Sequence, residues 1–192
     1  MSLNPIKFVS SALQPRSQLR LQLSTLSNKV SSFNGTANSI ANNTFLTFQN
    51  RSELGISIKY PINWRTIQAD NKALVLMPPS DEDKYSEILV LAVFGINNSI
   101  NVNHLSEQAI NNYGAHYNDF YILNLKPISF QGKSAYLLLY TYTNPTAGSI
   151  TAMDIGIKDG SKAYVISYSA EQQEYHSYLP IVEKIIDSFR LV

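Results

Sequence analysis

The sequence predicts a single α+β domain in which an antiparallel β-sheet is sandwiched between helices, an α/β/α arrangement. The chain has 192 residues, which is long enough for one substantial hydrophobic core. Two segments, 87–94 and 134–143, are apolar on both faces, so the sheet they form needs cover on both sides. The connections near 131–133, 144–148 and 158–161 are short turns, and turns of this length join only antiparallel neighbours.

The first 43 residues differ from the remainder in composition. They are rich in Ser, Asn, Gln and Leu, and they contain no apolar run long enough for a signal-peptide core or a membrane span. Leu19, Leu23, Leu26 and Val30 have helical spacing, so a helix over 17–31 is one interpretation and a mobile tail is the other, favoured one. We therefore divide the chain into a tail or linker, residues 1–43, in part helical at most, and a domain, residues 44–192. Whether an export signal has been removed from the natural chain stays open.

The domain begins with two predicted strands, 45–48 and 53–60. In the second, Ile56, Ile58 and Tyr60 alternate with polar residues, which is typical of a strand that is wet on one side. Pro61 ends the strand because it has no amide hydrogen, and Trp64 is expected to close the end of the core. A further short strand, 73–77, stops at two prolines, and an acidic loop follows.

Two helices are predicted to cover the sheet. The first runs from Val102 or His104 to Tyr117, with an Asn at 101 or 103 as its cap and an apolar stripe. The second is the C-terminal helix, for which Ser177 is the expected N-cap and Pro180 is placed in the first turn. Its stripe is formed by Tyr178, Val182, Ile185 and Phe189.

Four strands near 120–129, 134–143, 149–157 and 162–170 are predicted to form a meander. Asp159-Gly160 is a strong hairpin signal because glycine accepts a positive φ without steric cost. This topology argues against a nucleotide-binding doubly wound fold, and neither a GxGxxG nor a GxxxxGK[ST] stretch is present.

Composition and motifs exclude several function classes. The net charge of +1 and the lack of a Lys/Arg run argue against nucleic acid as a partner. Without cysteine the chain has neither a disulfide nor a thiolate metal site. No nucleophile with a neighbouring base can be assembled from the sequence, so we expect no enzyme activity and assign no catalytic residue.

Two acidic features are candidate sites. Asp81, Glu82 and Asp83 offer oxygens to a cation such as calcium or to a basic partner, but they lack the alternating ligands of an EF-hand loop, so a solvated loop is the simpler interpretation. Asp154 interrupts the apolar run from Ile150 to Ile157, and a buried carboxylate there would need a partner, for which Lys162 or Arg65 were candidates. No cofactor or metal ligand is assigned.

Three stretches together resemble the PsbP family, including its non-photosynthetic prokaryotic members: ELGISIKYPINW at 53–64, FQGKSAYLLLYTY at 130–142, and KAYVISYSAEQQEYHSYLPIVEKIIDSF at 162–189. The resemblance covers roughly residues 44–192. It implies an antiparallel sheet between helices, a fold shared with a Ran-binding nuclear import factor. The photosystem II member of the family is an extrinsic lumenal subunit that helps to retain calcium and chloride, and many prokaryotic relatives are exported proteins or lipoproteins. No ion-binding residue of the family matches a position here.

Three functions remain. The first is a non-catalytic binding or assembly module, extracytoplasmic and peripheral to a membrane, with a protein partner and a monomeric chain. The alternative is a carrier of a small ligand or of calcium, and the third and least favoured is a hydrolase. A patch of exposed tyrosine and leucine would favour the first, and a closed cavity the second. A serine or aspartate in contact with a histidine in a cleft would favour the third.

Overall fold

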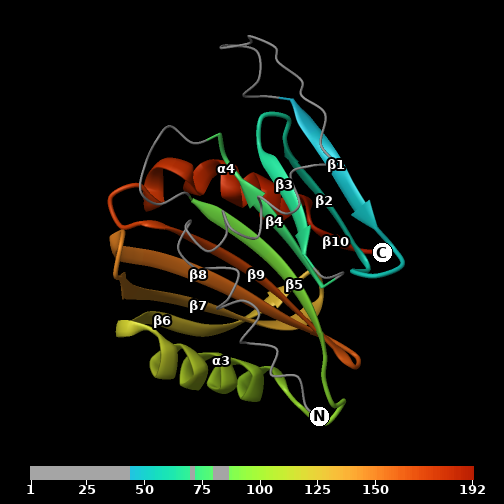
Figure 1. Ribbon diagram of the computed structural model, residues 1–192. Coiled ribbons are helices and arrows are strands. Elements are labelled where there is room, and N and C mark those ends of the chain that lie inside the picture. Colours follow the sequence, from blue (N-terminus) through green and yellow to red (C-terminus); the bar gives the residue numbers. More distant parts are fainter. Residues whose placement is uncertain (1–43, 70–71, 80–86) are drawn as a thin grey trace.

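The computed structural model describes residues 44–69, 72–79 and 87–192, which form two β-sheets and two helices (Figure 1). The first part of the chain contributes five strands, β1 to β5: Phe45–Asn50, Ile56–Pro61, Arg65–Ala69, Ala73–Met77 and Ile88–Gly95. Helix α3 follows at Val102–His116. Four long strands, β6 to β9, come next: Asn118–Phe130, Lys133–Asn144, Gly148–Asp159 and Lys162–Glu171. The chain ends with α4, Tyr175–Ser188, and the short strand β10, Arg190–Leu191.

The larger sheet has seven strands in the order β3-β4-β5-β9-β8-β7-β6, and each neighbouring pair is antiparallel. The predicted meander is therefore confirmed, with β6 as its outer strand. Gly160 has a φ of +57° in the turn between β8 and β9, as the hairpin prediction requires. The direct pairing of Asp159 with Lys162 shows that the chain reverses within this two-residue turn.

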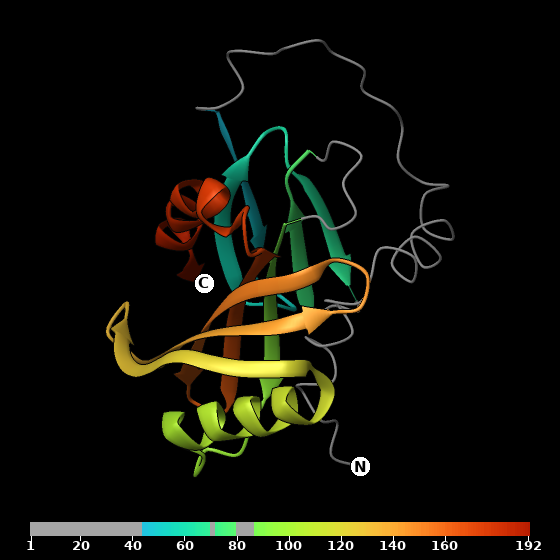
Figure 2. The ribbon, with the colours of Figure 1, turned by 90° about the vertical axis from the view of Figure 1, so that its left-hand side faces the viewer.

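The two faces of this sheet are covered differently. Helix α3 packs on one face over β6, β7 and β8, and Figure 2 shows it running alongside β6. The opposite face carries α4 together with a second sheet of three strands in the order β1-β2-β10. The predicted sandwich of one sheet between helices was thus correct only in outline. Because Ile56 and Ile58 of β2 are buried in the core, a small sheet contributes to a layer that was assigned to a helix alone.

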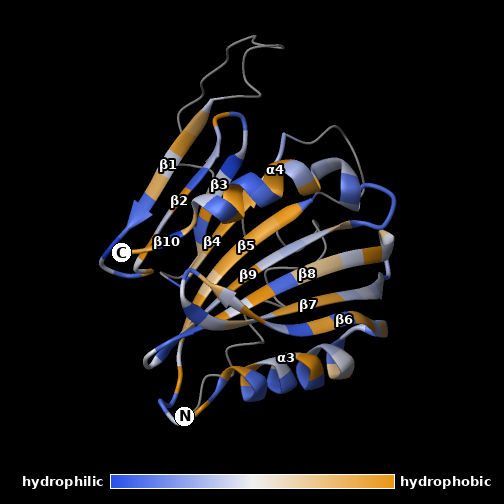
Figure 3. Cartoon of the chain, turned by 180° about the vertical axis from the view of Figure 1, so that it is seen from behind, coloured by the Kyte–Doolittle hydropathy of each residue, from blue (hydrophilic) through white to orange (hydrophobic). Residues whose placement is uncertain are grey.

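The core of the described residues divides into a large cluster on the α4 side, a smaller one beneath α3 and a third formed by residues of β4 and β5. Ile58, Leu89 and Ile185 are fully buried in the first, and Leu138, Tyr140 and Ile150 in the second. Strand β5 is hydrophobic along most of its length (Figure 3) and is buried from Ile88 to Val93, which confirms that it is a central strand. Trp64 is also buried and contacts Tyr178 edge-on, with 6.5 Å between the ring centroids.

The helix starts were predicted with different success. Asn101 caps α3, since its side chain accepts a hydrogen bond from the His104 amide at 2.9 Å. The cap at Ser177 was wrong, because α4 begins at Tyr175, and Pro180 consequently lies beyond the first turn. The earlier start is stabilised by burial of Tyr175, whose carbonyl accepts a hydrogen bond of 2.9 Å from the Tyr168 hydroxyl.

Candidate functional site

Strand β6 forms one edge of the seven-stranded sheet, and the short strand β3 forms the other. Within the described residues the backbone of β6 pairs only with β7, so its other side presents amide and carbonyl groups to solvent. All thirteen of its residues are exposed or half-buried. A long edge strand of this kind is a template for pairing with another strand unless the protein blocks it.

Four large apolar side chains are exposed within five residues of this edge. They are Tyr121 (67% exposed), Ile122 (37%), Leu123 (51%) and Leu125 (43%), which we call the β6 edge patch. Only three other large apolar side chains among the described residues are as open to solvent, and they lie outside β6. Clustering of this kind, more than exposure of a single residue, indicates an interaction surface.

The charges of β6 lie outside the patch. Asp119 precedes it and Lys126 follows it, and no charged residue lies between them. Neither side chain forms an ion pair or a hydrogen bond with any other residue that the structure describes. Edge strands are commonly protected by charges along their length, and here the centre of the strand lacks that protection.

Two irregularities alter which face of the sheet each β6 residue occupies. The register with β7 shifts between Asn118 and Tyr121 and again between Ile122 and Asn124, and Asp119 has a φ of +51°. At the second shift, Ile122 pairs with Tyr140 and Asn124 with Leu139, so Leu123 is the extra residue of a β-bulge. Ile122 pairs with Tyr140 and Leu125 with Leu138, and both of these β7 residues lie in the cluster beneath α3. Because residues that pair across strands share a face, Ile122 and Leu125 both lie on the α3 face although they are three positions apart.

The start of β6 is held in place by aromatic packing beneath α3. The Phe120 ring lies 6.0 Å from the Tyr113 ring and 5.5 Å from the Tyr140 ring. Tyr113 and Tyr140 stack on each other at 5.0 Å, and Tyr117 stacks on Tyr142 at 4.1 Å. These four tyrosines therefore pack together beneath α3, and they anchor the start of the edge strand.

A buried polar cluster underlies this packing. Asp154 of β8 is completely buried, and its carboxylate accepts hydrogen bonds from the hydroxyls of Tyr113 at 2.6 Å and Tyr140 at 3.5 Å. Ser167 pairs with Asp154 across the strands and is also buried. The predicted partners of Asp154 were wrong, because Lys162 and Arg65 are exposed and lie elsewhere.

Burial dominates the electrostatics of the cluster. Loss of hydration raises the pKa of Asp154 from its ordinary value of 3.8 to about 6, although the hydroxyls of Ser167, Tyr113 and Tyr140 favour the carboxylate and oppose the rise. Burial, with the Asp154 charge as the next cause, also raises the pKa values of Tyr113 and Tyr140 well above 10.0. The tyrosines therefore remain protonated and act as hydrogen-bond donors.

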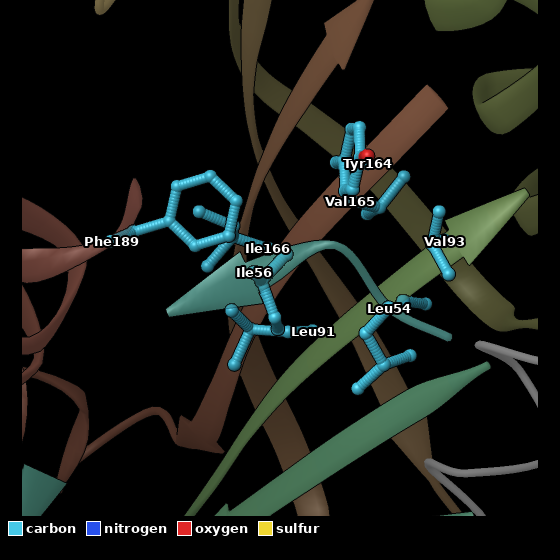
Figure 4. Close-up of a pocket in the computed structure, with 9 residues that line it drawn as sticks. Leu54, Ile56, Leu91, Val93, Tyr164, Val165, Ile166 and Phe189 are labelled. Atoms are coloured by element: carbon cyan, nitrogen blue, oxygen red, sulfur yellow. The ribbon is translucent and has the colours of Figure 1, made fainter. Parts of the chain in front are cut away.

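The internal cavities near these residues are small. A cavity of about 30 Å³ lies beneath α3, beside Leu105, Tyr113, Tyr136 and Gly156. A second one, of about 10 Å³, lies among mostly apolar side chains of β2, β5 and β9 and those of Leu54 and Phe189 (Figure 4). Binding sites for drug-sized ligands measure about 300–1,000 Å³, so neither cavity suits a carrier. A hollow of about 410 Å³ beside the start of α3 is open to solvent, with Asn101 and Lys158 in its lining.

The remaining predicted residues contribute little to a site. Asp81, Glu82 and Asp83 lie outside the described residues. Within the described part of the chain no three His, Asp or Glu side chains gather as metal ligands. His104 is 3.7 Å from Glu107, and His116 contacts the Asn112 carbonyl, so no described histidine has the serine or aspartate contact that the hydrolase hypothesis requires.

The described helices include none that is both long enough and apolar enough to cross a membrane.

The β6 edge patch was missed in the sequence. The strand itself was predicted, but its exposure was not, because the outer position in the sheet depends on the strand order. The signal was the run Tyr-Ile-Leu-Asn-Leu at 121–125, which is apolar, uncharged and followed by Lys126 and Pro127. Those last two residues are typical of a sheet edge.

These features define a class of protein: a small, sheet-dominated α+β domain that has an open, apolar strand edge. A model of the PsbP-like protein family matches residues 17–191, which is most of the chain and begins before the described residues. The chain therefore belongs to the PsbP-like protein family, as the resemblance indicated. A comparison with curated proteins found no match.

Solved structures share the fold at low sequence identity. The solution structure of cyanobacterial PsbP (CyanoP) from Synechocystis sp. PCC 6803 superposes with a TM-score of 0.59 at 12% identity, over 82% of this chain and 98% of that one. LpqN, involved in cell envelope biogenesis of Mycobacterium tuberculosis, gives 0.57 at 14%, over 81% and 98%. The Saccharomyces cerevisiae Ran-binding protein Mog1p gives 0.52 at 10%, over 78% and 97%. At these identities the similarity establishes the fold alone.

Proposed function

We propose that this protein is a non-catalytic binding module that associates with another protein through the outer edge of β6. The observation that carries the proposal is the β6 edge patch, which exposes a tyrosine and three large aliphatic side chains beside unpaired backbone groups. A patch of this composition was the expected mark of a binding module, as opposed to a carrier.

The mode of binding follows from the chemistry of a strand edge. An extended segment that lies along β6 would gain main-chain hydrogen bonds, and the exposed side chains would supply apolar contact. The centre of the edge is uncharged, so an apolar segment can approach without desolvating an ion. The rigid packing of Phe120 against Tyr140 keeps the strand extended before binding, which lowers the entropic cost of association.

Comparison with relatives supports the same class of function. Mog1p is described as a Ran-binding protein, and LpqN is described as involved in cell envelope biogenesis. We place the present protein outside the cytoplasm, in peripheral association with a membrane complex, on the strength of the family resemblance. No cofactor is part of this proposal.

The test uses affinity capture from the source organism with three full-length baits. The variant Leu123→Lys places a charge in the middle of the patch, and Ile62→Lys places the same charge at a site of similar exposure, 48% against 51%, outside β6. Proteins that bind through the edge should be retained by the wild type and by Ile62→Lys and lost with Leu123→Lys. Equal capture by all three baits would refute the assignment to β6.

A further inference from the structure

We infer that the strand which pairs with the β6 edge is β6 of a second copy of this chain, in an antiparallel, two-fold symmetric arrangement. This inference rests on the proposed function of the edge and names its partner. The centre of symmetry lies between Ile122 and Leu123, so that Ile122 of one copy faces Leu123 of the other. The two seven-stranded sheets then join into one continuous sheet.

The β-bulge makes this register possible. In a symmetric antiparallel pair the two-fold axis is perpendicular to the sheet, so residues that face each other must lie on the same face of their own strand. In this register Tyr121 faces Asn124 of the second copy. Tyr121 pairs with Thr141 of β7 and Asn124 with Leu139, so both lie on the face opposite α3. In a regular strand, residues three positions apart would point to opposite faces.

The next pair along the edge satisfies the same condition. Phe120 faces Leu125 of the second copy, and both belong to the α3 face, since Phe120 packs against Tyr113 and Leu125 pairs with Leu138. The exposed apolar residues of one copy therefore meet those of the other. The contact buries the apolar side chains of the β6 edge patch, and the hydrophobic effect therefore stabilises the dimer.

The charges select this register among its neighbours. Asp119 of one copy lies at the same level along the edge as Lys126 of the second copy, and symmetry repeats this proximity of opposite charges at the other end of the patch. Moving one strand by two residues places both charges opposite neutral residues. Pro127, which has no amide hydrogen, follows Lys126 and ends the pairing segment. Opposite charges that face each other across strands stabilise the pair, and like charges destabilise it.

A charge exchange tests the register directly. In the variant Asp119→Lys a second copy places Lys126 opposite a lysine, and in Lys126→Asp two acidic residues face each other. Each variant alone should dimerise about tenfold or more weakly than the wild type. A mixture of the two variants restores both ion pairs, so it should form a heterodimer, and the double variant should dimerise like the wild type.

The measurement is sedimentation velocity of the full chain over a concentration series, with a dimer at twice the 21.5 kDa chain mass. Far-ultraviolet circular dichroism and thermal melts establish that each variant is folded. This matters for Asp119→Lys because Asp tolerates the positive φ at this position better than Lys does. Lys126→Asp carries no such constraint and keeps the test decisive on its own.

Wild-type protein that stays monomeric at every concentration would overturn the inference, and so would a dimer that is indifferent to both charge variants. Either result leaves the proposed function standing if capture still depends on Leu123. Loss of both self-association and edge-dependent capture would reject the two proposals together.

Discussion

Replacing Asp154 by Asn should stabilise the protein at neutral pH, although it alters a completely buried and hydrogen-bonded residue. The desolvation cost of the buried carboxylate in the folded state is larger than that of an amide. The Asn side-chain oxygen can still accept the hydrogen bond from Tyr113, which is 2.6 Å long in the wild type. The substitution is nearly isosteric, so it leaves no cavity beneath α3.

The magnitude follows from the pKa of Asp154. Its value is about 6 in the folded protein and 3.8 as the ordinary value in the unfolded chain. The difference corresponds to about 3 kcal/mol of unfolding free energy. Because the folded pKa is raised, the native state binds more protons between these two values. The contribution of Asp154 to stability is therefore fully present below about pH 4 and is lost as the pH rises through 6.

The assay is urea unfolding of the wild type and of Asp154→Asn at a series of pH values, with the difference in unfolding free energy plotted against pH. We expect the variant to gain stability relative to the wild type between about pH 4 and 6 and to keep a constant advantage of up to about 3 kcal/mol above that range. The exposed Asp187→Asn is the control for loss of a carboxylate. A difference that does not change with pH, or a variant that is less stable near pH 7.5, would refute the reasoning.

Three further substitutions test other parts of the structure by the same unfolding assay. Gly156→Ala should destabilise by about 1–3 kcal/mol or more, since the new Cβ would lie 2.0 Å from the Tyr136 ring; a stability equal to wild type would show that the ring is free to move. Tyr113→Phe should cost about 1–3 kcal/mol near neutral pH and less in acid, because Asp154 loses its closest donor; a loss independent of pH would contradict this. Ile58→Val should cost about 0.5–1.5 kcal/mol, because Ile58 is fully buried between the sheets, and no change would argue against that packing.

Much of the fold could be predicted because local chemistry determines it. Asp159-Gly160 set the β8–β9 hairpin, Asn101 set the start of α3, and the apolar run of β5 set a central strand. Each of these signals depends on residues close together in the chain. The start of α4 could not be read in this way, because it is stabilised by contact of Tyr175 with Tyr168, which belongs to a different element, β9.

The candidate site was harder to predict for a related reason. Exposure of β6 depends on the strand order, which no local pattern reveals, and the bulge at Leu123 breaks the alternation by which faces are assigned. The prediction of a partner for Asp154 was wrong because we expected a buried acid to pair with a lysine or an arginine. The structure provides instead two tyrosine hydroxyls, which satisfy the carboxylate but leave its pKa raised.

The buried cluster and the exposed edge are connected through one residue. Tyr140 donates a hydrogen bond to Asp154 on the inner side and packs against Phe120 at the start of β6. Asp154→Asn leaves the packing of Tyr140 against Phe120 in place, so it should change stability without changing self-association. Leu123→Lys alters only an exposed side chain, so it should weaken self-association without changing stability. If the two variants separate in this way, the polar cluster serves the fold and the edge serves binding, and neither role requires chemistry at Asp154.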